Sequence, residues 1–295
     1  MGNDVEVTPA APAVRGVRAY ALFSAALAVA FGGTLLELVR VALRDDLASH
    51  TLLIPFVSAY LVWLGKDTLS QATPGARWPA AVPALAGLAL LAAPMSAENL
   101  LAARVLAFCL LLWAGGIALL GSGVMRAVAF PALFLVFMAP LPPFAVNAIE
   151  AFYQHTSAAL AFRFIDWTGT PVFREGLTFT MAGLAVHVGP ECSGIRSSYV
   201  LFITSLLAGY LFLRSPWRRL VLALFVIPLG IVRNAFRVFV LSMLSVHVDP
   251  WWIDSPLHHR GGPVFFVLSL GPFFLFLWWL RRREEGRRRF RAPHR

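Results

Sequence analysis

The segment Gly189-Pro190-Glu191-Cys192-Ser193-Gly194-Ile195-Arg196-Ser197-Ser198 is polar and runs directly into an apolar helix, which we predict over residues 199–213. The chain of 295 residues has only two cysteines, and this segment places one of them between a glutamate and a Ser-Gly turn at a bilayer boundary. We therefore interpret Cys192 as a catalytic thiol. The alternative is a small packing residue beside a turn, since buried cysteines usually behave as small hydrophobes.

The composition indicates a polytopic membrane protein. Hydrophobic residues make up 59% of the chain and charged residues 14%, against about 25% charged residues in a soluble domain. The net charge of +10 comes largely from residues 281–295, where arginines cluster in two runs of three. Such a tail indicates a topology anchor that faces the cytoplasm and its anionic lipids, so we do not expect nucleic-acid binding. The second cysteine, Cys109, lies in an apolar run and is expected to pack there, so no disulfide is predicted.

Eight apolar runs are long enough, or nearly so, to cross about 30 Å of hydrocarbon. They cover residues 20–39, 51–64, 78–95, 100–120, 125–141, 198–213, 220–246 and 263–280. We predict an all-α polytopic membrane protein with about eight transmembrane helices. Its parts are a cytoplasmic lead-in (residues 1–19), a single transmembrane domain (residues 20–280) and a basic cytoplasmic tail (residues 281–295).

Basic residues in the short loops predict the orientation, because cytoplasmic loops carry an excess of Lys and Arg. With eight spans, most of these residues fall on the side of both termini, which we assign to the cytoplasm. The connection over residues 142–197 then lies outside. The cytoplasmic set consists of Arg15, Arg18, Lys66, Arg77, Arg126, Arg214, Arg218, Arg219 and the arginines of the tail.

The outer connection is predicted to contain an interfacial helix and a small hairpin. Residues 147–167 have helical periodicity, with Glu150, Gln154 and His155 interspersed among apolar-facing positions. Residues 177–181 and 184–188 flank the pair Ala182-Gly183 and predict a β-hairpin with a two-residue turn. This hairpin is expected to deliver the cysteine to the membrane surface. The apolar-facing positions of the helix are Ala148, Phe152, Ala159 and Phe162.

The seventh apolar run contains Arg233, Asn234 and Arg237. Ionisable residues inside a span are costly and usually face the bundle interior, so they are functional candidates. Their spacing lets all three point toward one cavity. A rise of 1.5 Å per residue from the cytoplasmic end puts Arg237 about 25 Å along the helix, near the outer boundary. The alternative is that these arginines snorkel or form structural pairs.

A third polar segment, His258-His259-Arg260-Gly261-Gly262, precedes the eighth apolar run at its outer end. No carboxylate or second histidine cluster completes a metal site, so we predict no metal. A histidine at a water-membrane boundary is suited to proton transfer. Alone such a residue is often structural, but the topology brings three segments with different catalytic residue types to one face.

These motifs resemble the exosortase/archaeosortase family of polytopic membrane cysteine transpeptidases. The family pattern Cys-Ser-Gly-hydrophobic-Arg-Ser resembles Cys192–Ser197, which includes Ser193, Gly194 and Arg196. Its Asn-x-x-Arg pattern resembles Asn234 to Arg237, and its His-x-x-x-Gly pattern resembles His258 to Gly262. The similarity covers about the last half of the chain. The chain departs from the family in having Pro263 after the motif glycine, Glu191 before the cysteine, and a doubled histidine that leaves His259 as an alternative to His258.

The resemblance implies a bacterial cytoplasmic-membrane enzyme with its active site on the extracytoplasmic face. Its expected substrates are exported proteins with a PEP-CTERM-like C-terminal sorting signal, which comprises a short motif, a transmembrane helix and a basic tail. Cys192, Arg237 and His258 are the expected catalytic residues, with Glu191, Arg233 and the other motif residues in support. Neither a cofactor nor a nucleic acid is expected, and the membrane lipid is the remaining partner.

Two other functions are compatible with the same residues. A boundary cysteine protease would use water to resolve the acyl-enzyme, and it would need the same side chains. A transporter would line an anion path with the buried arginines, which predicts broken helices in two similar halves. The sequence shows no such repeat, and a purely structural role leaves the convergence of Cys, Arg and His unexplained.

Overall fold

The computed structural model describes residues 11–45, 47–181, 184–189, 193–253, 255 and 262–291. Almost all of this chain is helical, which confirms the all-α polytopic class, and it divides into two compact units at residues 143 and 144. Within the described residues, four helices are long and apolar enough to cross a membrane, or up to six if each of two bent helix pairs is one span. Two shorter apolar helices, Ser49–Leu64 and Trp78–Ala92, match the second and third expected spans. The expected total of eight remains a prediction.

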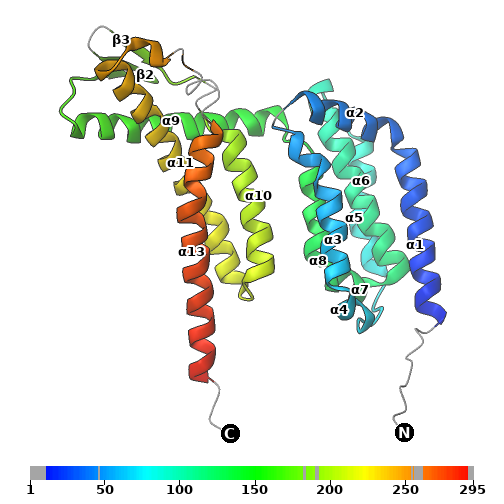
Figure 1. Cartoon of the computed structure of the whole chain (residues 1–295). Coiled ribbons are helices and arrows are strands. Elements are labelled where there is room, and N and C mark those ends of the chain that lie inside the picture. Colours follow the sequence, from blue (N-terminus) through cyan, green and yellow to red (C-terminus); the bar gives the residue numbers. More distant parts are fainter. Residues whose placement is uncertain are drawn as a thin grey trace. The chain divides into compact units, whose positions relative to one another are not determined.

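Unit 1 is built around its longest helix, α6, which contacts α1, α2 and α5 (Figure 1). Helix α6 is apolar apart from Glu98, Asn99 and Arg104 in its first third, and it buries Cys109, which confirms the packing role expected for that thiol. The elements of unit 1 are α1 (Ala11–Ala30), α2 (Gly32–Arg44), η1 (Ser49–Leu52), α3 (Ile54–Leu64), α4 (Lys66–Ser70), η2 (Trp78–Ala80), α5 (Ala81–Ala92), α6 (Ala97–Leu120), α7 (Ser122–Ala127), α8 (Ala129–Phe134) and η3 (Leu135–Met138).

The first expected span is not one straight helix. It is divided into α1 and α2, which meet at an angle of 70° next to the pair Gly32-Gly33. Two consecutive glycines weaken a helix because they have the largest backbone entropy to lose. Helix α2 is amphipathic, since Leu38 and Ala42 are buried while Glu37 is exposed. A hydropathy window over residues 20–39 combines these two different helices into one run.

The fifth expected span, residues 125–141, is also broken. Helix α7 ends at Ala127, α8 begins at Ala129, and the run closes in the 3-10 turn η3. Pro131 lacks a backbone N–H, and its ring clashes with the carbonyl four residues earlier, which is that of Ala127. Helix α7 therefore ends at Ala127, and Pro131 lies in the separate helix α8.

Unit 2 contains three long helices that run side by side, α10, α11 and α13 (Figure 1). Their bounds are α10 (Ile195–Phe212), α11 (Pro216–His247) and α13 (Gly262–Arg291). Their shared core consists mainly of leucines, with one alanine, one valine and one phenylalanine, and Leu201, Leu222 and Phe273 are fully buried in it. These helices correspond to the last three expected spans, although α13 continues well into the expected basic tail.

Helix α9 (Pro143–Trp167) crosses one end of these three helices, and a small sheet packs beside it (Figure 1). The sheet is antiparallel in the order β1 (Phe173–Glu175), β2 (Thr178–Met181), β3 (Leu184–His187). Its buried residues join α9 and the far end of α11 in a second core, which includes Ile165, Phe179 and Val238. The structure confirms the expected hairpin, with Met181 opposite Leu184. It adds β1, which the sequence analysis missed, while the two turn residues lie outside the described part.

Helix α11 is longer than a membrane needs. Its 32 residues extend about 48 Å at 1.5 Å per residue, against a hydrocarbon core of about 30 Å. The second half of this helix, residues 232–247, packs against α9 and the sheet, and Ala235 and Val238 are buried there. Arg233 and Arg237 lie in this segment. They are therefore covered by protein, which explains how two cations are accommodated there.

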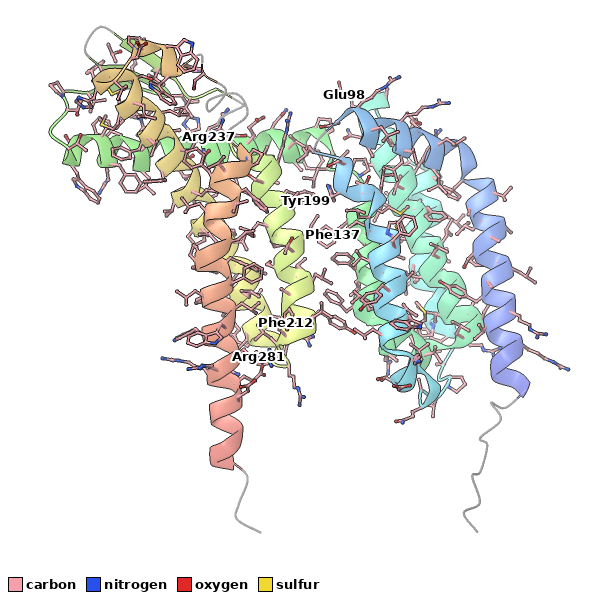
Figure 2. All side chains as sticks on the ribbon, viewed as in Figure 1. Glu98, Phe137, Tyr199, Phe212, Arg237 and Arg281 are labelled. Carbon is pink, nitrogen blue, oxygen red and sulfur yellow. The ribbon has the colours of Figure 1, made fainter. Side chains whose placement is uncertain are left out.

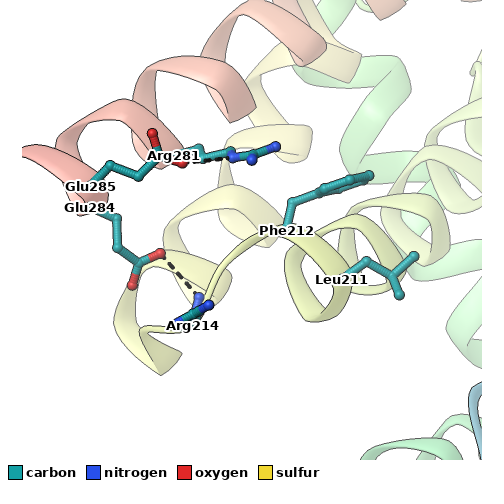
Figure 3. Close-up of a pocket in the computed structure, with 6 residues that line it drawn as sticks. All are labelled: Leu211, Phe212, Arg214, Arg281, Glu284 and Glu285. Atoms are coloured by element: carbon teal, nitrogen blue, oxygen red, sulfur yellow. Dashed lines mark hydrogen bonds and ion pairs between the residues drawn. The ribbon is translucent and has the colours of Figure 1, made fainter. Parts of the chain in front are cut away.

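The opposite end of unit 2 holds the described part of the basic tail. Glu284 of α13 accepts hydrogen bonds from the backbone N–H groups of Arg214 (3.0 Å) and Ser215 (2.9 Å), at the start of α11. The same carboxylate pairs with Arg218 at 3.5 Å. A pocket of about 390 Å³ lies here (Figure 3). It is lined by Leu211, Phe212, Arg214, Arg281, Glu284 and Glu285.

Candidate active site

Four of the expected site residues lie outside the described part of the chain. They are Glu191, Cys192, His258 and His259. The described part of the chain continues at Ser193, which follows Cys192 in the sequence, and at Gly262, the first residue of α13. The site is therefore built from the residues that flank the cysteine and the histidines, together with the complete α11 motif.

The cysteine segment enters α10 through a left-handed turn at Gly194. This residue is the N-cap of α10 and has φ of +68°, a conformation that glycine adopts without the steric penalty of a Cβ. Its carbonyl oxygen accepts hydrogen bonds from the backbone N–H of Ser198 (3.0 Å) and the hydroxyl of Ser197 (3.1 Å). The turn is thus internally bonded immediately after Cys192.

Arg233 of α11 binds this turn directly. Its Nη2 donates to the Gly194 carbonyl oxygen at 3.1 Å and to the Ser198 hydroxyl at 2.8 Å. The guanidinium is almost fully buried, and within the described residues its Nη1 has no hydrogen-bond partner. The delocalised guanidinium of arginine keeps its positive charge in such a site. A permanent positive charge therefore stands beside the turn that follows the cysteine.

Asn234, the next residue of α11, links the turn to α9. Its Nδ2 donates to the Ser157 hydroxyl at 2.8 Å. On its other side, a Cβ at Gly194 would lie 3.1 Å from Asn234 Oδ1 and 3.2 Å from Arg233 Nη2. Two features therefore require a glycine at position 194. They are its left-handed backbone conformation and the close approach of α11.

Helix α9 contributes polar groups to the site that the sequence analysis did not select. Glu150 accepts a hydrogen bond from the Ser193 hydroxyl at 3.2 Å, and Tyr153 is hydrogen-bonded to Ser198. Together with Ser157 they occupy positions three and seven residues apart on one helix face. The positions expected to be apolar-facing are on the other side, where Ala148, Phe152 and Ala159 are exposed and Phe162 is half-buried. The helical spacing of these polar residues marks the inner face of α9. It singles them out only when the neighbouring helices that they contact are known.

Gly230 has a packing role that the sequence analysis did not anticipate. In the structure a Cβ at this position would lie 2.7 Å from Ser198 Oγ and 3.0 Å from a ring carbon of Tyr153. The missing side chain lets α9 and α10 approach α11 at the level of the site.

Arg237 and the start of α13 complete the described site. Arg237 is buried one helical turn beyond Arg233, near the end of α11 that adjoins α9 (Figure 2). Its neighbour Phe236 makes an edge-to-face contact with Phe265 of α13, with ring centroids 6.3 Å apart. Phe265 follows Gly262 in the third motif, so this contact brings the third motif to the second. Arg196, by contrast, is exposed.

The described parts of the three motifs therefore meet at one end of unit 2. Gly194, which caps α10, approaches Arg233 and Asn234 of α11, and Phe265 of α13 contacts Phe236 of the same helix. Within the described residues, no group of three or more His, Cys, Asp or Glu is placed to hold a metal ion. The arrangement is a buried polar site with fixed cations and hydrogen-bond donors, of the kind that stabilises a thiolate or an oxyanion.

These features define a polytopic membrane protein whose polar site lies where transmembrane helices meet a small surface module. Comparison with protein families is consistent with that class. The family model of the transmembrane exosortases (Exosortase_EpsH) matches residues 42–275. The chain belongs to the transmembrane exosortase family, and the similarity extends well upstream of the half of the chain that carries the motifs. Membership supports a membrane transpeptidase or protease role in general.

No match was found among the curated proteins, and none among the solved structures.

Proposed function

We propose that the protein is a membrane cysteine transpeptidase that cleaves the C-terminal sorting signals of exported proteins. The observation that carries this proposal is the contact of Arg233 with Gly194, at 3.1 Å, together with the Asn234 bridge to Ser157. These bonds hold the backbone that follows Cys192 in one conformation beside a permanent cation. A nearby positive charge favours the thiolate, which is the nucleophilic form of cysteine.

In the proposed reaction, Cys192 Sγ attacks the scissile carbonyl carbon. The new C–S bond gives a tetrahedral intermediate whose negative oxygen is stabilised by the guanidinium of Arg237. Collapse of this intermediate breaks the C–N bond, and His258 donates a proton to the departing amine. The product retained on the enzyme is a thioester of Cys192.

The second half of the reaction releases this thioester. His258 takes a proton from the incoming nucleophile, which attacks the thioester carbonyl and expels the Cys192 thiolate. His259 is the alternative for this proton-transfer role. Ser193, Gly194, Asn234 and Arg233 support the turn, and no cofactor takes part in either step.

The substrate class follows from family membership and the membrane setting. A sorting signal with its own transmembrane helix brings the scissile bond to the membrane boundary, where α9 and the sheet cover the end of α11. We propose that this end faces outward across a bacterial cytoplasmic membrane and that the basic tail faces inward. The acceptor is an amine or hydroxyl compound in a transpeptidase, or water in a protease that has the same residues.

Trapping of the acyl-enzyme tests the proposal. The enzyme is incubated with a protein carrying a sorting signal, and intact-mass spectrometry is expected to detect the truncated substrate attached to Cys192 as a hydroxylamine-labile thioester. Cys192→Ala is expected to abolish both the adduct and the processing at normal protein level. Cys109→Ala, the matched control in unit 1, is expected to retain processing. Processing that survives in Cys192→Ala would exclude thiol catalysis.

A further inference from the structure

Helix α9 carries three polar side chains on the face that meets the site, and each binds a different part of it. Ser157 accepts from Asn234 of α11, and Tyr153 is bonded to Ser198 of α10. Glu150 accepts from Ser193, the residue that follows Cys192. Two of these contacts join helices to each other. The third reaches the cysteine segment itself, before α10 begins.

Ser193 is almost fully buried, with 1% of its surface exposed. Its hydroxyl oxygen also accepts a hydrogen bond from the backbone N–H of Ile195, at 3.4 Å, while donating to Glu150 Oε1. The Ser193 hydroxyl is thus held by two hydrogen bonds, one to α9 and one from the first residue of α10. Because Ser193 and Cys192 share a peptide bond, holding Ser193 anchors the chain at the residue next to the thiol.

Glu150 differs from the other members of the network in its chemistry. A carboxylate is a charged acceptor, and charge-assisted hydrogen bonds are roughly twice as strong as neutral ones. The site otherwise presents the cations of Arg233 and Arg237, which lie four residues apart on α11.

We propose that Glu150 is a positioning residue for Cys192 and acts through the hydroxyl of Ser193. This inference rests on the proposed function, because it assigns Cys192 as the nucleophile. Glu150 touches neither substrate nor thiol in this role. It orients the serine, and the serine fixes the direction in which the neighbouring thiolate presents its lone pair to the scissile carbonyl.

The first test is a double-mutant cycle on the full-length enzyme in detergent or nanodiscs. Glu150→Ala and Ser193→Ala are each expected to lower kcat about tenfold, as for loss of one charge-assisted hydrogen bond, with KM within about twofold. The double variant is expected to be no slower than either single variant, since both remove the same bond. Asp166→Asn, an exposed carboxylate on the same helix, serves as the control and should keep full kcat. Full activity in Glu150→Ala, or single effects that multiply in the double variant, would overturn the inference.

Rescue distinguishes positioning from a general loss of packing. Glu150→Gln retains an acceptor oxygen at the same distance from the backbone, so it is expected to keep kcat within about threefold of the parent, as a neutral hydrogen bond in place of a charged one. Thermal unfolding of all variants shows whether they are folded. A Gln variant as slow as the Ala variant, with an unchanged melting temperature, would contradict a role through the hydrogen bond.

A second readout does not depend on turnover. In a Cys109→Ala background, the alkylation rate of Cys192 by iodoacetamide reports how the thiol is presented. Glu150→Ala and Ser193→Ala are expected to change this rate by the same factor, and Glu150→Gln to restore it. If Cys192→Ala retained processing, the proposed function would fail while this comparison still decided the positioning role. Rates that are equal in all variants would reject it.

Discussion

The guanidinium of Arg233 and the carbonyl oxygen of Gly194 are joined by a hydrogen bond of 3.1 Å, which connects two segments 39 residues apart in the sequence. The bond places a cation of α11 against the turn that carries the cysteine into α10. Arg237 is the arginine that matches the family motif, but the contact with the turn belongs to Arg233. We therefore propose separate roles for the two arginines, with Arg233 holding the turn and Arg237 taking part in the chemistry.

Exchange of each arginine for lysine is expected to separate these roles. Arg237→Lys keeps a charge but loses the planar pair of donors, so turnover should fall about a hundredfold, as for loss of an oxyanion donor. Arg233→Lys replaces the single nitrogen that makes both bonds, Nη2, by the ammonium of a shorter side chain, so both bonds to Gly194 and Ser198 are weakened. It should lower turnover less, about tenfold or below, and should also lower the melting temperature.

Both variants are compared at matched levels of membrane protein, because an unpaired buried charge threatens folding. Steady-state cleavage of a sorting-signal substrate gives the turnover, and thermal unfolding in detergent gives the stability. A stable but inactive Arg233→Lys beside a near-normal Arg237→Lys would show that the catalytic arginine is Arg233.

The turn at Gly194 offers a test with an internal control. Gly194→Ala adds a Cβ at φ of +68°, 3.1 Å from Asn234 Oδ1. Gly176→Ala adds one at φ of +60° in a turn where it would meet nothing within 4 Å. Both substitutions incur backbone strain of about 1 kcal/mol, but only the first displaces Asn234.

We expect Gly194→Ala to reduce cleavage at least tenfold, since misplacement of a catalytic group by about 1 Å reduces rates by up to a hundredfold. Gly176→Ala should retain cleavage with a modest loss of stability. Equal cleavage by the two variants would mean that the close approach of α11 to Gly194 has no role in the reaction.

Much of unit 2 was predictable from the sequence, because local patterns determine it. The alternation over residues 177–188 predicts the hairpin, and the spacing of Asn234 and Arg237 places both on one side of α11. The convergence of three motifs follows from topology alone, since each occurs at the same end of its span. Gly194 is also recognisable, as a glycine between a polar turn and an apolar helix.

The role of α9 was not predictable in the same way. A glutamate, a tyrosine and a serine at helical spacing are ordinary on any amphipathic helix, and only the positions of Ser193, Ser198 and Asn234 turn them into a bonded network. The break between α1 and α2 is missed for a different physical reason. Hydropathy averages over a window, whereas the bend depends on two glycines that leave the mean almost unchanged.

The orientation across the membrane is tested by two exposed residues at opposite ends of unit 2. Phe173 lies on β1 and Trp217 in the first turn of α11, and both side chains are exposed. In a cysteine-free background, Phe173→Cys should react with an impermeant maleimide added outside intact cells. Trp217→Cys should react only after the cells are opened, because the neighbouring Arg214, Arg218 and Arg219 favour the cytoplasm.

The two positions act as controls for each other, since both side chains are well exposed in the isolated protein. Denaturing the samples before labelling confirms that each cysteine is present and reactive. The reverse labelling pattern would put the cysteine site on the cytoplasmic side and rule out exported proteins as its substrates.

Two adjacent glutamates of α13, Glu284 and Glu285, differ in the contacts that they make near the start of α11. Glu284 accepts two backbone hydrogen bonds, from Arg214 and Ser215, and its carboxylate lies near the N-terminus of α11, where negative charge is favourable (Figure 3). Glu285 makes a single ion pair with Arg281 on its own helix, and both partners are largely exposed. Exposed pairs of this kind contribute about 0.5 kcal/mol or less.

Glu284→Ala should therefore destabilise the protein by about 2 kcal/mol, since hydrogen bonds to charged groups are worth more than neutral ones. Glu285→Ala should leave stability nearly unchanged. Thermal unfolding in one detergent measures both, and Glu284→Gln, which keeps an acceptor but loses the charge, should fall between them. A Glu284→Ala variant as stable as Glu285→Ala would show that the described part of the tail does not hold the α10–α11 turn in place.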